Sequence, residues 1–248
     1  MTDHTERNGK KLAYHATQGA GPGVVFLGGF KSDMEGTKAL ALEDWAKREG
    51  RAFLRMDYSG HGISDGAFED GTIGDWFQDA LAVMEAATSG KQILVGSSMG
   101  GWIALLIARN RPERVAGLVT IAAAPDFTED SYWADFNEIL RAKLRKDGWV
   151  RVPSDYGEPY TITHKLIEEG RERLVLRSPL PLPFPVRFLQ GTNDTAVTTD
   201  TALRLLKHAE GPDLRLTLVD GADHRFSDAA CLALIERSVM EVSERVRA

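Results

Sequence analysis

The stretch from residue 91 to residue 108 constrains the fold of this chain more than any other. A short apolar run, Ile93 to Val95, has the length of a buried strand, and residues 99–108 form an apolar segment of helical length. Between them lies Gly96-Ser97-Ser98-Met99-Gly100, so the chain must turn sharply from strand to helix. Glycines at both ends let the two elements approach closely, and the serine at the tip, Ser98, is strained. This pattern predicts strand, tight turn and helix, with an exposed nucleophilic serine at the turn.

A second Gly-x-Ser-x-Gly match, at residues 62–66, competes with the first one. Its serine, Ser64, lies in a run of turn-forming residues, 59–62. The residues after it, 67–71, are not those of a helix. Because a nucleophile needs the strand-turn-helix context, the sequence favours Ser98 over Ser64.

Short apolar runs alternate with amphipathic segments along most of the chain. An edge strand is expected at residues 10–18. The other predicted strands are 24–27, 52–56, 92–95, 115–124, 186–190 and 214–219, and the predicted helices are 37–48, 72–88, 99–108, 201–209 and a last one from 227. This alternation is typical of an α/β protein with a mostly parallel sheet and helices on both faces. We expect residues 1–248 to form a single domain.

The alternation stops at Pro125. From there to about residue 178 no convincing strand is found, but helices are expected at about 130–146 and 161–171. We therefore predict a small helical cap, residues 125–180, inserted within the α/β domain. Alternating prolines at the exit, between residues 179 and 185, indicate a stiff extended strut, although a proline-rich ligand for another protein has the same composition.

The overall charge argues against two classes of partner. The net charge is −6, and no basic stripe or tail is present, which disfavours nucleic acid or an anionic membrane as partner. No apolar run is long enough to span a membrane, and the first residues resemble neither a signal peptide nor a transit peptide. The expected location is the cytoplasm. Cys231, the single cysteine, excludes an intrachain disulfide.

A serine nucleophile needs a base and an acid that orients the base. In a sheet of this topology they follow later strands, in the order serine, acid, histidine. Asp194 comes directly after the strand that ends at residue 190, and His224 comes soon after the strand that ends at residue 219. Because the carboxyl ends of parallel strands share one edge of a sheet, Ser98, Asp194 and His224 are predicted to meet as a catalytic triad. Asp220 and Asp223 compete as the acid but lie on the loop of the histidine itself.

An oxyanion hole requires two backbone N–H donors close to the nucleophile. The residue after the nucleophile, Met99, supplies the first. Gly28-Gly29-Phe30 follows an early strand, and its glycines allow a close approach, so the Phe30 N–H is predicted as the second donor. A plain tight turn at Gly28-Gly29 is the alternative.

Together these motifs resemble the α/β-hydrolase superfamily over essentially the whole chain: Gly28-Gly29-Phe30, Asp57-x-x-Gly-His-Gly-x-Ser64, Gly-Ser-Ser-Met-Gly-Gly101, Asp194 and His224. More narrowly, residues 32–40, 57–60, 95–102 and 178–181 resemble the branch of mitochondrial palmitoyl-protein thioesterases and acyl-glucuronide esterases. The resemblance implies cleavage of acyl thioesters or activated acyl esters by Ser98, Asp194 and His224. No transit peptide is apparent, so we do not expect the compartment and physiological substrate of that branch to carry over.

The predicted cap contains candidate substrate-binding residues. Tyr132 and Phe136 begin an apolar stripe with a spacing of four residues, and Trp133 lies beside it. The stripe either lines an acyl pocket or simply packs against the body, and packing is the more common role. Arg141 and its basic neighbours either bind an anionic group of the substrate or form a solvated helix face.

The predicted activity is that of a serine hydrolase without metal or organic cofactor, because no phosphate loop and no His/Cys metal-ligand spacing is found. Its expected partner is a small acyl ester or thioester, and an acylated protein is one form of such a substrate. Two alternatives remain. One keeps the triad but cleaves carboxylic esters or carbon–carbon bonds, and the other is a ligand-binding receptor on the same scaffold.

Overall fold

The computed structural model describes residues 2–154 and 158–247. Within these residues, eight strands form one sheet in the order β1-β2-β4-β3-β5-β6-β10-β12. Their bounds are β1 Asp3–Arg7, β2 Lys10–Thr17, β3 Ala20–Leu27, β4 Arg51–Met56, β5 Gln92–Ser97, β6 Val115–Ile121, β10 Val186–Gly191 and β12 Leu214–Val219. From β4 to β12 every neighbouring pair is parallel, whereas β1 and β2 are antiparallel to their neighbours. The predicted mostly parallel sheet is confirmed.

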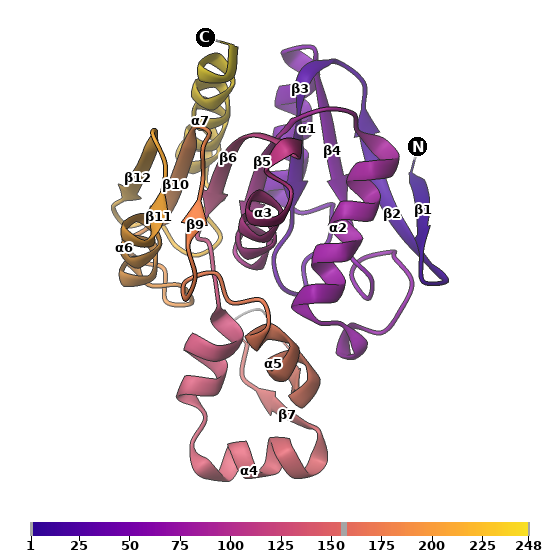
Figure 1. Cartoon of the computed structure of the whole chain (residues 1–248), viewed down its shortest axis with the longest axis vertical. Helices are drawn as coiled ribbons and strands as arrows, with labels where there is room; N and C mark the ends of the chain where they lie inside the picture. Colours follow the sequence, from indigo (N-terminus) through magenta and orange to yellow (C-terminus); the bar gives the residue numbers. More distant parts are fainter. Residues whose placement is uncertain (1, 155–157, 248) are drawn as a thin grey trace.

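Helices cover both faces of this sheet (Figure 1). On one face lie α1 (Thr37–Arg48) and α7 (Ala229–Arg247), which share a core with the side chains of Phe53 and Val95. On the other face lie α2 (Ile73–Ala87), α3 (Met99–Asn110) and α6 (Thr199–His208), packed with Leu54 and Leu94. Consecutive residues of a strand point to opposite faces, so each central strand contributes to both cores. The predicted α/β-hydrolase fold, with helices on both faces, is confirmed.

The start of α2 shows how a local signal fixes one of these helices. Thr72 precedes the helix, and its hydroxyl oxygen accepts a hydrogen bond from the Asp75 N–H at 3.1 Å. Such a cap satisfies one of the N–H groups that have no partner in the first turn of a helix. The predicted helix start at this position is confirmed.

One edge of the sheet differs from expectation. The strand predicted at residues 10–18 exists as β2, but it is not an edge strand, because β1 pairs with it in antiparallel register. The β1 sequence, Asp-His-Thr-Glu-Arg, has no apolar residue, and three of its five side chains are exposed. A strand on the rim of a sheet needs no apolar face, so hydrophobic periodicity does not detect it.

The segment between β6 and β10 lies below the sheet in Figure 1. It contains a π-helical turn (Thr128–Trp133), α4 (Glu138–Asp147), a hairpin of β7 (Trp149–Val152) and β8 (Tyr160–Thr163), and α5 (His164–Arg171). The expectation of no strand between residues 125 and 178 was therefore wrong. The single helix expected at 130–146 is divided into two helical pieces. The Asn137 side chain accepts a hydrogen bond from the Leu140 N–H and so caps the start of a separate helix, α4.

The two ends of this segment are held together by one buried carboxylate. Asp126 accepts hydrogen bonds from the Val175 N–H at 2.7 Å and the Leu176 N–H at 3.0 Å, and from Arg177 at 2.6 Å. Asp126 is fully buried, so these bonds satisfy a charge that would otherwise be costly to desolvate. The chain leaves the body and returns to it at nearly the same point.

The remaining short elements connect the larger ones. They are two 3₁₀ turns, η1 (Phe68–Asp70) and η2 (Pro112–Arg114), and the two-residue strands β9 (Leu180–Pro181) and β11 (Ala209–Glu210), which pair in parallel. The proline-rich exit at residues 179–185 thus runs through β9 into β10, as a structural strut. Within the described residues, none of the helices combines the length and the apolar character that crossing a bilayer requires.

Candidate active site

The turn between β5 and α3 has the tight geometry that its glycines require. Ser98 sits at the tip with φ 54° and ψ −118°, a strained conformation for a residue with a side chain. A Cβ atom added at Gly100 would come within 2.0 Å of the Leu27 carbonyl oxygen, and one at Gly96 within 2.3 Å of the Gly100 oxygen. Only glycine therefore lets α3 pack this closely against β3 and β5. The serine is fixed at the carboxyl end of the sheet.

The structure brings Ser98, His224 and Asp194 together in one chain of hydrogen bonds. The Ser98 hydroxyl oxygen lies 3.1 Å from His224 Nε2, and His224 Nδ1 lies 2.8 Å from Asp194 Oδ2. In this arrangement Nδ1–H donates to the carboxylate, and Nε2 accepts the hydroxyl proton. The Asp194 side chain is fully buried, whereas 17% of the His224 side chain is exposed. The imidazole thus has one side held in the protein and the other open to a ligand.

The environment of Asp194 keeps this carboxyl group ionised. Burial alone would raise its pKa, but hydrogen bonds from His224, the Val197 N–H and Gln190 outweigh burial and hold the pKa below its usual range. Asp194 Oδ1 accepts from the Ala196 and Val197 N–H groups at 2.9 and 2.8 Å, and Gln190 Nε2 donates to Oδ2 at 3.1 Å. A charged, fixed carboxylate is what a histidine base needs beside it.

The two competing acids have other partners. Asp220 accepts from the Thr192 hydroxyl at 3.1 Å, and Asp223 accepts from the Phe226 N–H at 3.1 Å. Both hydrogen bonds fix the conformation of the loop that carries His224. Their carboxylates stabilise the loop that carries His224, whereas the carboxylate that contacts the imidazole is that of Asp194.

The loop after β3 lies against the nucleophile. A Cβ atom at Gly29 would lie 3.4 Å from the Ser98 Cβ atom, so the backbone of residues 28–30 passes directly beside the serine. Met99 begins α3, where a backbone N–H has no acceptor within its own helix. Phe30 and Met99, the two residues predicted as oxyanion donors, both lie next to Ser98 and line the same cavity with it.

A network that sequence reasoning did not assign supports this loop. The Tyr58 hydroxyl donates to the Gly28 oxygen at 3.3 Å, and the Lys31 N–H donates to His61 Nε2 at 3.2 Å. His61 Nδ1 lies 3.3 Å from the Ser59 oxygen, which fixes Nδ1 as the protonated nitrogen. Burial lowers the pKa of His61 to about 4, so the ring is neutral near pH 7 and Nε2 is an acceptor. The early Gly-His-Gly run was the signal that pointed to this position.

Ser64, the serine of the second motif, is part of the same support. Its hydroxyl donates to the Asp57 oxygen at 2.8 Å and accepts from the Ala13 N–H at 2.8 Å. Ser64 is buried, and its hydrogen bonds are to backbone groups. It acts as a structural tie between β2 and the loop after β4.

Two cavities meet at Ser98 and His224, and both are also lined by Phe30 and Tyr160. The first, about 280 Å³, extends toward α1, and its lining includes three cationic residues, Lys31, Lys38 and Arg225, and one acidic residue, Asp33. We call it the cationic cavity. The second, about 270 Å³, extends under the segment 125–180 and is lined by the apolar residues Met99, Ala124, Phe127, Tyr132, Ala196 and Val197, together with the hydroxyl-bearing residues Ser131, Ser154 and Thr195. We call it the apolar cavity.

Of the four residues expected to bind substrate, Tyr132 lines the apolar cavity. The other three lie outside the linings of both cavities. Phe136 is buried and stacks on Tyr132, with ring centroids 6.2 Å apart. Arg141 donates to the Trp133 oxygen and lies over the Trp133 ring, 5.0 Å from its centroid. These contacts join the three side chains to other residues of the segment 125–180 and so stabilise that segment.

Tyr160 is a lining residue that sequence reasoning missed. It begins β8, in the hairpin that was expected to contain no strand. The signal was present as alternation in Trp149-Val-Arg-Val152 and in Tyr160-Thr-Ile-Thr163, both rich in residues that favour strands. Its ring packs against Phe30 at 5.5 Å between centroids, which places the hairpin over the nucleophile.

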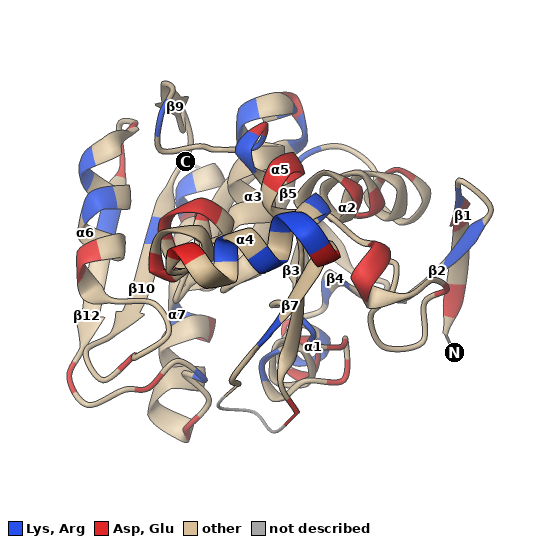
Figure 2. Ribbon diagram, turned by 90° about the horizontal axis from the view of Figure 1, so that it is seen from below, with Lys and Arg blue, Asp and Glu red and all other residues tan. Residues whose placement is uncertain are grey.

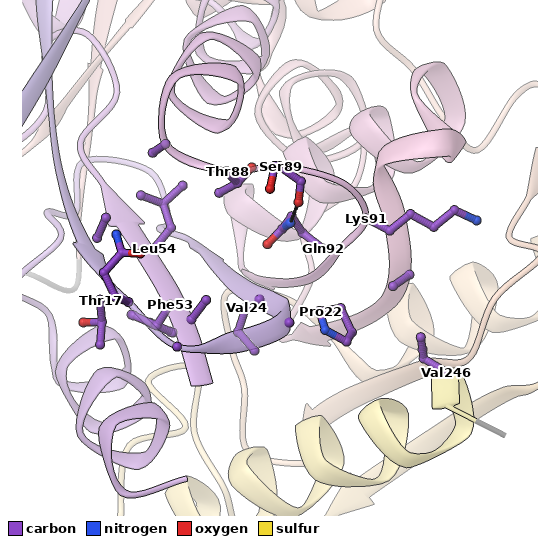
Figure 3. Close-up of a pocket in the computed structure, with 18 residues that line it drawn as sticks. Thr17, Pro22, Val24, Phe53, Leu54, Thr88, Ser89, Lys91, Gln92 and Val246 are labelled. Atoms are coloured by element: carbon purple, nitrogen blue, oxygen red, sulfur yellow. Dashed lines mark hydrogen bonds between the residues drawn. The ribbon is translucent and has the colours of Figure 1, made fainter. Parts of the chain in front are cut away.

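A larger cavity, about 490 Å³, lies elsewhere (Figure 3). It is lined by residues such as Thr17, Pro22, Phe53 and Gln92. Gln92 is the first residue of β5, whereas Ser98 directly follows the last, so the length of the strand, about 20 Å, separates this cavity from the nucleophile. In α/β sheets ligands bind at the carboxyl ends of the strands. The cavities at Ser98 are therefore the better candidates, although they are smaller.

Comparison with known proteins agrees with this geometry. A family model described as serine aminopeptidase, S33, matches residues 22–165. The mitochondrial palmitoyl-protein thioesterase ABHD10 of Bos taurus is 35% identical over 240 residues, which cover 95% of this chain and 77% of the relative. The protein of the same name from Mus musculus is 36% identical over 237 residues, which cover 95% and 80%.

Two solved structures share the whole fold. A putative hydrolase from Agrobacterium vitis S4 superposes with a TM-score of 0.92 at 38% identity, covering 98% of this chain and 97% of the other. Alpha/beta hydrolase domain-containing protein 10 from mouse superposes with a TM-score of 0.92 at 33% identity, covering 99% of each chain.

The parallel sheet between two layers of helices, with a serine on the turn after a central strand, defines the class of protein: this is an α/β-hydrolase, a hydrolytic enzyme. Within that class, the chain belongs to the family matched by the S33 model, in the branch of palmitoyl-protein thioesterase ABHD10.

The expected cytoplasmic location is wrong. The five ABHD10 relatives, 35–36% identical over 95% of this chain, are all named as mitochondrial proteins. The expectation rested on the lack of a leader-like segment at the start of the sequence. The absence of a segment carries no information about location, whereas similarity over nearly the whole chain does.

Proposed function

We propose that this hydrolase cleaves acyl thioesters or activated acyl esters through Ser98, His224 and Asp194. The observation that carries the proposal is the unbroken hydrogen-bond chain from the Ser98 hydroxyl through His224 to Asp194, with distances of 3.1 and 2.8 Å. A serine hydroxyl becomes a useful nucleophile only when a base takes its proton. Here the base is fixed by a buried carboxylate, and the nucleophile faces two cavities.

The reaction follows from this geometry. The Ser98 oxygen attacks the acyl carbonyl carbon while its proton passes to His224 Nε2, and the carbonyl oxygen becomes an oxyanion. The Phe30 and Met99 N–H groups stabilise that oxyanion. When the intermediate collapses, the thiolate or alkoxide leaves and takes the proton from His224, so the acyl group remains on Ser98. Water, deprotonated by the same histidine, then releases the acid.

The two cavities suggest how the substrate lies. We assign the acyl group to the apolar cavity, because apolar side chains such as Phe127 and Val197 line it, and the leaving group to the cationic cavity. The apolar cavity, about 270 Å³, is at the small end of ligand pockets, for which about 300–1,000 Å³ is usual. This favours short and medium acyl chains, or a longer chain whose end extends beyond the cavity.

In this proposal the whole chain is one catalytic domain, and residues 125–180 act as its cap. Three of these residues, 155–157, lie outside the described part of the chain. The cap contributes Phe127, Tyr132 and Tyr160 to the site, so it acts on substrate choice and leaves the bond-breaking groups to the body. The thioesterase names of the relatives support acyl thioesters as the first substrates to test.

The decisive experiment compares Ser98→Ala with Ser64→Ala. A fluorophosphonate probe should label the wild-type enzyme and Ser64→Ala, whereas Ser98→Ala should show no label and no turnover. Labelling of Ser64, or turnover by Ser98→Ala, would refute the proposed nucleophile. A panel of acyl thioesters, aryl esters and acyl glucuronides of graded chain length then defines the substrate class. Tight binding without turnover of any of them would indicate a receptor.

The cavity assignment has its own test in Ser131→Trp. Ser131 lines the apolar cavity and no hydrogen bond of the triad involves it. The larger side chain should lower kcat/KM for an octanoyl thioester by roughly tenfold or more, and that for an acetyl thioester by less than about threefold. An equal loss for both chain lengths would argue against acyl binding in this cavity.

A further inference from the structure

The outer surface of α4 and β7, which we call the α4–β7 surface, combines exposed apolar side chains with clustered positive charge. Ile139 is 79% exposed and Trp149 is 43% exposed, both high values for large apolar residues. This surface lies at the bottom of the molecule in Figure 1, at the opposite end of the long axis from the C-terminus, and in Figure 2 the basic residues of α4 face the viewer.

The geometry of α4 groups these side chains on one side. Ile139, Lys143 and Lys146 are spaced by four and three residues, so they share one face of the helix. All three are exposed. The Lys143 ammonium lies 5.7 Å from the centroid of the Trp149 ring, which joins the helix face to the strand. The Arg151 guanidinium lies 6.0 Å from the centroid of the same ring.

The charge of this surface is opposite in sign to that of the whole protein. Residues 138–151 contain five basic and two acidic side chains, in a chain of net charge −6. Both acids are already paired, Glu138 with Arg141 and Asp147 with Lys143. The net charge of the chain had argued against an anionic membrane as partner, but the sum conceals a local excess of positive charge.

We propose that the α4–β7 surface docks onto an anionic lipid bilayer. A tryptophan and an aliphatic side chain flanked by lysine and arginine match an interface in which apolar groups enter the acyl region and cations contact phosphate groups. A nucleic acid would not use the exposed Ile139. A stable protein interface would need a larger apolar centre than two side chains supply.

Docking in this orientation has a consequence for the substrate. The strand β7 leads directly into Pro153 and Ser154, which line the apolar cavity beside Ser98. A bilayer in contact with Trp149 would therefore lie next to the segment that borders this cavity. The inference concerns the surface alone and does not depend on the identity of the nucleophile.

The test is vesicle flotation of the whole protein. Vesicles of phosphatidylcholine are compared with vesicles in which about one third of the lipid is phosphatidylglycerol. We expect binding to the anionic vesicles only, weakened by high salt. Lys143→Glu/Lys146→Glu should lower the partition coefficient on the order of twentyfold, because each lysine near an anionic surface contributes about fivefold. Trp149→Ala should weaken binding further.

The matched control is Lys91→Glu/Lys207→Glu, which makes the same change of charge at exposed positions on other elements. It should bind vesicles nearly as well as the wild type. Hydrolysis of a small soluble ester, measured for every variant, checks that each one is folded. Equal binding to both kinds of vesicle, or equal loss in both double variants, would overturn the proposal. Failure of the wild type to bind anionic vesicles would also overturn it, in favour of an acidic protein partner.

Discussion

Replacing His61 by phenylalanine tests whether the support beneath the loop of residues 28–31 serves catalysis. His61 Nε2 accepts the Lys31 N–H at 3.2 Å, and the ring packs within 5.4 Å, between centroids, of Tyr58, Phe68 and Trp76. Phenylalanine keeps an aromatic ring in this position and removes the acceptor. The Lys31 amide then lacks its partner and the loop must shift to find another.

We expect His61→Phe to slow the chemical step of the reaction. The bond from the Lys31 N–H to His61 is only partly buried, so its loss costs about 1 kcal/mol, at the low end for an unpaired donor, and the loop is then free to shift. The residue before Lys31 is Phe30, the proposed oxyanion donor, and complete loss of one such donor costs about 10²–10³ in kcat. We expect kcat to fall by about 30- to 300-fold and KM to change by less than about threefold, because the oxyanion contact forms only in the transition state.

Steady-state kinetics with a soluble activated ester and urea denaturation measure the two effects separately. Ser64→Ala is the matched control, because it removes two buried hydrogen bonds of 2.8 Å from the same region without touching residues 28–31. It should lose about 1–3 kcal/mol of stability and retain nearly all of kcat. His61→Gln, whose side-chain oxygen is an acceptor, should recover part of the activity. If both positions lower kcat equally, or if His61→Phe raises KM alone, the reasoning is refuted.

Three further predictions follow from the same structure. Burial lowers the pKa of His61 from 6.5 to about 4, so as the pH falls the unfolded chain takes up a proton at this residue at a higher pH than the folded chain does. Stability should therefore fall on the order of 3 kcal/mol as the pH drops from 6.5 to 4, and urea denaturation of His61→Phe should lack this step. Asp194→Asn should lower kcat about 10⁴-fold at unchanged fold, and a loss below tenfold would exclude it as the acid. Gly100→Ala forces a Cβ to within 2.0 Å of the Leu27 oxygen and should cost about 3 kcal/mol or more in urea denaturation, whereas Gly36→Ala, with its nearest atom at 3.5 Å, should cost less than about 1 kcal/mol.

The central sheet and its helices could be predicted from the sequence because their signals are local. The apolar run before Ser98 and the glycines at 96 and 100 specify a buried strand and a tight turn without reference to the rest of the chain. The meeting of Asp194 and His224 with Ser98 also followed from a general rule, that parallel strands end at one edge of their sheet.

Other features depend on contacts between distant parts of the chain. His61 acts through a hydrogen bond from the Lys31 N–H, 30 residues away in the sequence, which only the folded structure brings near it. Residues 149–152 and 160–163 form strands because they pair with each other, and β1 is stabilised by pairing with β2 and by the ion pair of its Arg7 with Asp79 of α2. An apolar stripe in the sequence indicates that a face is buried, but does not indicate whether a ligand or the protein covers it.

The carboxylate of Asp126 closes the excursion between β6 and β10 at its base, and further hydrogen bonds, such as that from the Gly74 N–H to Glu169, join the excursion to the body. The strands on either side of this excursion, β6 and β10, are direct neighbours in the sheet, and a single buried group joins the points of departure and return. Because the two ends of the excursion meet at this group, its inner part can change without altering the pairing of β6 with β10. Evolution, or a protein engineer, can redesign what the enzyme accepts and leave intact the part that breaks the bond.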